Sequence, residues 1–154
     1  KRQKPIVGSL FTVPLPDGTF AVGQIVGREP DMMNSWTCAF TRRRLSSEQA
    51  TSLTPIEECE LIAVHFVTGD LIKRGAWEIR GVAPVTLSRR FFPFEHLRQT
   101  RWVGAKMIGS GIIQKFLAAF HGLRFWDEMK DPDYYRGLLL PGTPLPNDLK
   151  RKSA

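Results

Sequence analysis

The residues best suited to chemistry in this chain are arginines interleaved with aromatic side chains. Three arginines occupy positions 42–44, and the segment 89–94 reads RRFFPF, with further cations up to position 106. Guanidinium groups bind phosphates and carboxylates, whereas aromatic rings stack on bases or anchor protein interfaces. The candidate interface residues are the arginines of both clusters and a nearby tryptophan: Arg42, Arg43, Arg44, Arg89, Arg90 and Trp102.

The partner of such a surface is left open by these residue types. A formal net charge of +7 favours nucleic acid, anionic lipid or an acidic protein surface. Single-stranded RNA or DNA is one alternative, since cations meet phosphates while rings stack on bases. An acidic protein is another, through electrostatic steering and charge-assisted pairs. In a purely structural interpretation, the three phenylalanines are core residues and the arginines form a solvated rim.

Catalytic and metal-binding patterns are weak. The three histidines, at 65, 96 and 121, have neither zinc-ligand spacing nor a cysteine at i+3 or i+4. No activating signature surrounds Cys38 or Cys59, and adjacent carboxylates such as Glu57 and Glu58 point apart. We therefore expect no enzyme activity, no cofactor and no metal.

Size and composition indicate one ordinary globular domain over residues 1–154, with 42% hydrophobic and 24% charged residues. No apolar run of bilayer length occurs, and no signal-peptide core follows the basic start, so we expect no membrane insertion. Two cysteines do not make a disulfide framework, which favours a cytoplasmic location. Residues 1–6 and 141–154 are expected to be extended or mobile tails.

The first two-thirds of the chain has the pattern of β structure. Pro16-Asp17-Gly18 supplies a tight reversal between two apolar runs. Phe11, Val13 and Leu15 share one face of the first run, and Phe20 and Val22 share one face of the second, which predicts a hairpin with a large apolar side. Further strands are expected over 35–41, 61–67 and 75–81.

Helices are expected mainly in the last third. Apolar residues at 112, 113, 116, 117 and 120 form one stripe, with Ser110 as N-cap and Gly122 as the C-terminal stop. His121 falls in the last turn, where protonation is favoured by the helix dipole. Asp131-Pro132 predicts the start of a second, short helix.

Two segments resemble the immunity protein 26 family of bacterial polymorphic toxin systems. The first carries Gly8, an aromatic at Phe11, VPL at 13–15, Asp17-Gly18, an aromatic at Phe20, then Gly23 and the branched Ile25. The second is GAWEIRG at 75–81, closely followed by Pro84-Val85. Ser9 departs from the family pattern, in which an acidic residue is common. The resemblance implies an antidote that binds a toxin made by the same cell, and it implies no catalytic residues.

These observations predict a β-dominated α+β fold: a strongly bent antiparallel sheet or partly open small barrel with one or two covering helices. The function favoured by the sequence is that of a non-catalytic immunity protein that occludes the active site of a cognate toxin. The alternative is a single-stranded nucleic-acid-binding module that uses the basic and aromatic residues.

Overall fold

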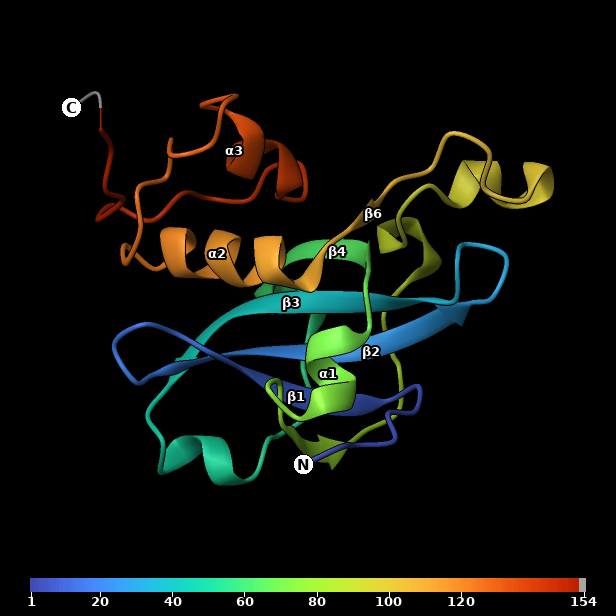
Figure 1. Ribbon diagram of the computed structural model, residues 1–154, viewed down its shortest axis with the longest axis horizontal. Coiled ribbons are helices and arrows are strands. Elements are labelled where there is room, and N and C mark those ends of the chain that lie inside the picture. Colours follow the sequence, from blue (N-terminus) through green and yellow to red (C-terminus); the bar gives the residue numbers. More distant parts are fainter. Residues whose placement is uncertain (153–154) are drawn as a thin grey trace.

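A single six-stranded sheet organises the chain, in the order β5-β1-β2-β3-β4-β6 (Figure 1). The computed structural model describes residues 1–152. The expected β-dominated α+β class is confirmed, and the sheet is open. The strands are β1 (Ser9–Pro14), β2 (Phe20–Glu29), β3 (Ser35–Leu45), β4 (Leu61–Val67), β5 (Ile79–Val82) and β6 (Met107–Ile108).

The predicted hairpin is formed by β1 and β2. The Asp17 carboxylate accepts hydrogen bonds from the backbone N–H and the hydroxyl of Thr19, and Gly18 has a φ of +85°. This local chemistry closes the reversal at the predicted position.

The two runs of the hairpin do not share one apolar side, contrary to the expectation. Phe11 lies opposite Gly23 whereas Thr12 lies opposite Val22, so Val22 and Phe11 are on opposite faces. Both faces are covered. The face toward the helices includes Phe11, Val13, Trp36, Cys38 and Phe40, and the other includes Leu10, Val22, Val26, Ala39 and Val64.

Gly23 shows why the hairpin needs a glycine in mid-strand. A Cβ at this position would lie 2.7 Å from the Phe11 ring and 2.9 Å from the Ala39 carbonyl oxygen. Phe11 can therefore lie flat beneath the sheet, where its ring stacks on Trp77 at 5.4 Å between centroids.

The sheet is mixed rather than antiparallel throughout. Strand β6 pairs in parallel with β4 because the chain returns to the sheet through the long segment 83–106, and not through a tight turn. The strand expected over 75–81 is shorter and later, Ile79–Val82. Trp77 precedes it, after a short helix α1 (Asp70–Arg74) that no pattern in the sequence predicted.

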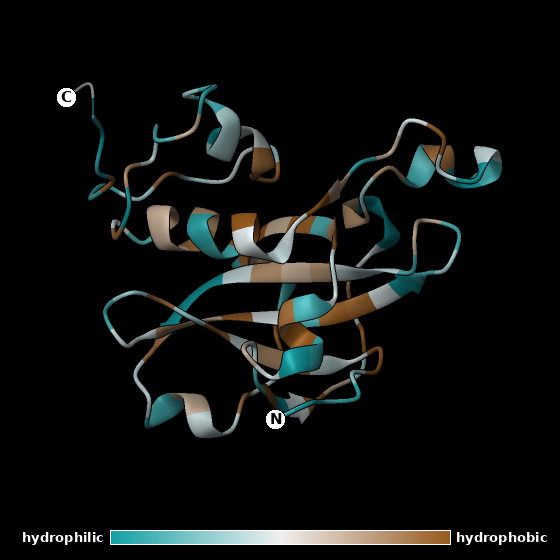
Figure 2. Ribbon diagram, viewed as in Figure 1, coloured by the Kyte–Doolittle hydropathy of each residue, from teal (hydrophilic) through white to brown (hydrophobic). Residues whose placement is uncertain are grey.

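Helices cover one face of the sheet, and α2 (Ser110–Phe120) packs its apolar stripe there as expected. Figure 2 shows that hydrophobic and hydrophilic residues alternate along this helix. Gly109, not Ser110, is the N-cap. Ser110 lies in the first turn, where its hydroxyl donates to Asp70 at 2.8 Å and links α2 to α1. Gly122 follows the helix with a φ of +77°, as predicted.

The last described elements close over α2. Helix α3 (Tyr134–Leu138) begins after Asp133 rather than Asp131, whose carboxylate accepts from the Asp133 N–H. The chain then runs without a helix and returns beside Phe125, where the Trp126 N–H donates to the Lys150 carbonyl at 2.7 Å.

Candidate functional site

The second basic and aromatic cluster forms a separate projection on the sheet, which we call the arginine–aromatic lobe (residues 89–106). Two short 3-10 helices, Arg89–Phe91 and Glu95–Thr100, make up half of it. Its core is a small apolar cluster in which Trp102 contacts Phe66 of β4 edge-to-face at 5.2 Å and is joined by Met32 of the β2–β3 turn. Cations and rings occur together in this segment because the rings pack against the sheet and thereby fix the segment in place.

Guanidinium groups cover the rings of this lobe. Arg89 lies 3.9 Å above Phe92 and Arg90 lies 4.3 Å above Phe91. Arg98 lies 4.7 Å above Trp102. Stacking of this kind orients each guanidinium and leaves its N–H edges free for carboxylate partners.

Most cations of the lobe already have such partners within the chain. Arg89 pairs with Glu95 at 2.9 Å, and Arg98 pairs with both Glu95 and Glu29. Arg101 reaches Asp31 at 3.3 Å. The contacts to Glu29 and Asp31 attach the lobe to β2 and to the β2–β3 turn.

Backbone strain gathers in the same region. In the described part of the chain, every non-glycine residue with positive φ belongs to the β2–β3 turn or to the lobe: Met33, Asn34, Phe94, Arg101 and Trp102. Such conformations cost roughly 1–3 kcal/mol each and persist where surrounding contacts impose them. They are commonest at binding and switch sites, which makes this end of the molecule the strongest site candidate.

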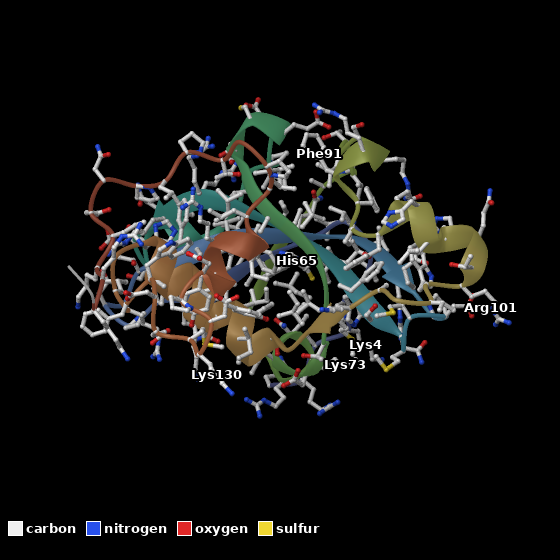
Figure 3. The ribbon with its side chains drawn as sticks, turned by 90° about the horizontal axis from the view of Figure 1, so that it is seen from above. Lys4, His65, Lys73, Phe91, Arg101 and Lys130 are labelled. Carbon is white, nitrogen blue, oxygen red and sulfur yellow. The ribbon has the colours of Figure 1, made fainter. Side chains whose placement is uncertain are left out.

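A groove with a volume of about 470 Å³ separates the lobe from α3. Val64 and His65 of β4 form its floor, and Figure 3 shows Phe91 beside that strand. Apolar residues dominate the walls, and two cations, Arg90 and Lys106, lie at the rim. The wall residues are Phe91, Phe92, Pro93, Phe94, Met107, Ile108, Tyr134, Gly137, Leu138 and Leu140.

Arg42, Arg43 and Arg44 lie away from this groove, because they occupy the last residues of β3 whereas the lobe packs near its first. The first cluster is thus separate from the groove, although residues 58 and 59 connect the two clusters: Arg42 donates to the Cys59 carbonyl, and the Ser88 N–H, next to Arg89, donates to the Glu58 carboxylate at 2.6 Å. The sequence could not show this separation because both clusters read alike.

Each arginine of the first cluster contacts groups within the fold. Arg43 donates to both carboxylate oxygens of Glu60, at 2.6 and 2.8 Å, and is only 17% exposed. Arg44 pairs with Asp17; hydrogen bonds from Thr19, and then this guanidinium, lower the pKa of the Asp17 carboxyl to about 2. Arg42 donates to the Cys59 carbonyl at 2.6 Å.

Trp102 is 5% exposed, so its ring supports the lobe from beneath and contributes little surface of its own. The expectation of an exposed anchor at this position overlooked the apolar contacts to Met32 and Phe66, which come from distant parts of the sequence. Lys106 was noted only as a cation of the basic cluster, and Tyr134 and Gly137 were not considered as groove residues. No spacing in the sequence links them, since only the parallel β4–β6 pair and α3 bring them to one groove.

The thiols and imidazoles have structural surroundings. Cys38 is buried in the core, where burial raises its pKa, and Cys59 is exposed. His65 forms a 2.7 Å hydrogen bond with the Leu138 carbonyl, which ties β4 to α3. Among residues 1–152, no group of three or more His, Cys, Asp and Glu side chains is arranged to hold a metal ion.

His121 behaves oppositely to the expectation of a protonated imidazole at the end of α2. Burial lowers its pKa to about 4, and the nearby Arg44 guanidinium adds to the effect. Its Nε2 atom is buried, with no hydrogen-bond partner in the described residues. The helix dipole is outweighed because the ring is removed from water.

This neutral imidazole predicts a pH-dependent stability. Below pH 6.5, the pKa of this histidine in the unfolded chain, the unfolded chain takes up a proton that the folded chain excludes. The contribution of His121 to the free energy of unfolding is therefore fully present above that pH and decreases as the pH falls toward 4. Burial of His65 acts in the same direction. Between pH 7 and pH 5, urea unfolding of wild type should lose about 1–2 kcal/mol. His121→Gln should lose clearly less; parallel curves for the two proteins would contradict the assignment.

Comparison with known proteins agrees with the resemblance of the two segments. The family model described as immunity protein 26 matches residues 6–101, which is more than half of the chain. No curated protein and no solved structure gives a significant match. None of the helices within residues 1–152 combines the length and hydropathy needed to cross a membrane. The matched range contains β1 to β5 and the 89–94 wall of the groove; the chain thus belongs to the immunity protein 26 family.

Proposed function

We propose that this protein is a non-catalytic immunity protein that binds a cognate bacterial toxin and neutralises it by covering the toxin's active site. The observation that carries the proposal is the family match over residues 6–101. A bound antidote needs no chemistry of its own. An interface of ordinary size, roughly 800 Å² per partner, is enough to obstruct a catalytic cleft.

The arginine–aromatic lobe and the groove beside it are the proposed contact surface. Arginine is enriched among residues that dominate protein interfaces, and Arg89 and Arg90 are held in place by stacking on Phe92 and Phe91. The net charge of +7 suits a toxin whose contact face is acidic. A nuclease, which grips phosphates with a basic face, fits this surface less well.

The nucleic-acid alternative uses the same residues but is less well supported. Base stacking needs exposed ring faces, whereas Phe91, Phe92 and Trp102 are each covered by a guanidinium. Each of these rings is also at least partly buried. Carboxylates of a protein partner can reach the N–H edges of the arginines without moving the rings.

Co-expression with the toxin encoded beside this protein tests the proposal. We expect growth to be restored and the two proteins to co-purify. Absence of both rescue and co-purification would count against toxin neutralisation. Salt-dependent binding to a generic oligonucleotide that disappears in Arg89→Ala/Arg90→Ala, with no toxin binding, would instead favour the nucleic-acid module.

A further inference from the structure

The groove between the lobe and α3 has two features that point to an occupant. The first is the open edge of β4. Strand β6 pairs with this edge only at Phe66 and Val67, and the Leu140 N–H reaches it at the Ile62 carbonyl, 2.7 Å away. Residues 62, 64 and 66 direct their backbone groups to the same edge, so those of Val64 face the groove between these two contacts. The floor of the groove thus combines an apolar side chain with backbone hydrogen-bonding groups.

The second feature is the charge at the rim. In contrast to Arg89, Arg98 and Arg101, which have carboxylate partners, neither Arg90 nor Lys106 has one in residues 1–152. Arg90 is nevertheless held in position by the ring of Phe91. Two cations that lack a carboxylate partner in the described residues, placed beside an apolar groove, fit a ligand that carries both carboxylates and an apolar side chain.

We propose that this groove receives an acidic loop of the toxin, which inserts an apolar side chain between Phe91 and α3 and directs its carboxylates to Arg90 and Lys106. The inference rests on the proposed function and specifies its contact site. A volume of about 470 Å³ accommodates a few side chains, which matches a loop tip rather than a whole element. Apolar walls with a charged rim are the usual anatomy of an interface hot spot.

Gly137 offers a direct steric test. It lies on α3, lines the groove and is exposed, and a Cβ built on it meets no atom within 4 Å. Gly137→Leu should therefore fold normally, since leucine favours helices more than glycine does, while its side chain occupies space that the loop needs. Gly111 is a matched control: it is exposed on α2, also has open space around its Cβ, and lies outside this groove.

Charge reversal tests the rim independently. Arg90→Glu/Lys106→Glu places like charges opposite the toxin's carboxylates, and Lys4→Glu/Lys73→Glu makes the same change in net charge at two lysines, labelled in Figure 3, that do not line the groove. Affinity for the purified toxin should fall about 100-fold in the rim variant and stay near wild type in the control. Gly137→Leu should weaken binding at least about 30-fold, and Gly111→Leu should not.

The outcomes separate the two proposals. Thermal unfolding of every variant is measured first, and Arg90→Gln/Lys106→Gln replaces the charge reversal if that variant does not fold. If wild type binds the toxin and the groove variants bind equally well, the groove assignment is wrong while the proposed function stands. If wild type does not bind the toxin, both proposals fail. Loss of oligonucleotide binding alone in the groove variants would also overturn the assignment.

Discussion

Replacement of Trp77 by alanine should lower the free energy of unfolding by about 3–5 kcal/mol, a severe loss for a single substitution. Trp77 is fully buried; it stacks on Phe11 at 5.4 Å and meets Phe40 edge-to-face at 6.0 Å. Its indole N–H also donates to Gln114 of α2 at 3.1 Å. The alanine variant leaves a cavity between the sheet and α2 and removes the hydrogen bond that the Gln114 Oε1 atom accepts.

Chemical denaturation followed by circular dichroism measures this loss, and Trp77→Phe separates its two parts. Phenylalanine retains the stacking on Phe11 and removes only the N–H and part of the volume, so this variant should lose less than half as much. An alanine variant within about 1 kcal/mol of wild type would show that the Trp77 cluster is not the centre of the core.

Replacement of Arg43 by alanine should cost about 2–4 kcal/mol, which is unusual for a position within an arginine run. Its guanidinium donates to both oxygens of Glu60 and also to the carbonyls of Thr54 and Pro55, so it holds the 46–60 connection against β3. These contacts lower the pKa of the Glu60 carboxyl. Removing the arginine leaves a half-buried carboxylate without its main partner.

Arg42→Ala is the matched control, because Arg42 is exposed and, within residues 1–152, donates only to the Cys59 carbonyl. We expect it to cost less than about 1 kcal/mol. Thermal and urea unfolding of the two variants, side by side, give the comparison. Equal effects of the two substitutions would mean that the Glu60 pair contributes nothing measurable.

Local chemistry in the sequence was sufficient to predict the hairpin and the main helix. Pro16-Asp17-Gly18 closes β1 and β2 because its hydrogen bonds lie within the turn itself. The stripe on α2 likewise depends on spacing alone. Which residues lie on which face of the sheet could not be predicted in the same way, because both faces are buried and apolar residues occur on each.

The candidate site was predicted only in part. The sequence identified Arg89 and Arg90 because they are adjacent to phenylalanines. It could not reveal that Arg43 forms an ion pair within the fold, since its partner Glu60 is seventeen residues away. The groove itself depends on contacts at still longer range: β6 joining β4, and Leu138 hydrogen-bonded through its carbonyl to His65.

A titration of toxin activity with the purified protein tests most directly whether it acts by binding alone. We predict that inhibition increases linearly with added protein and becomes complete at a one-to-one ratio, with the toxin recovered intact from the complex. Undiminished toxin activity at equimolar concentrations would contradict neutralisation by occlusion. Complete inhibition by far less than one equivalent, with the toxin altered, would show instead that the protein is an enzyme.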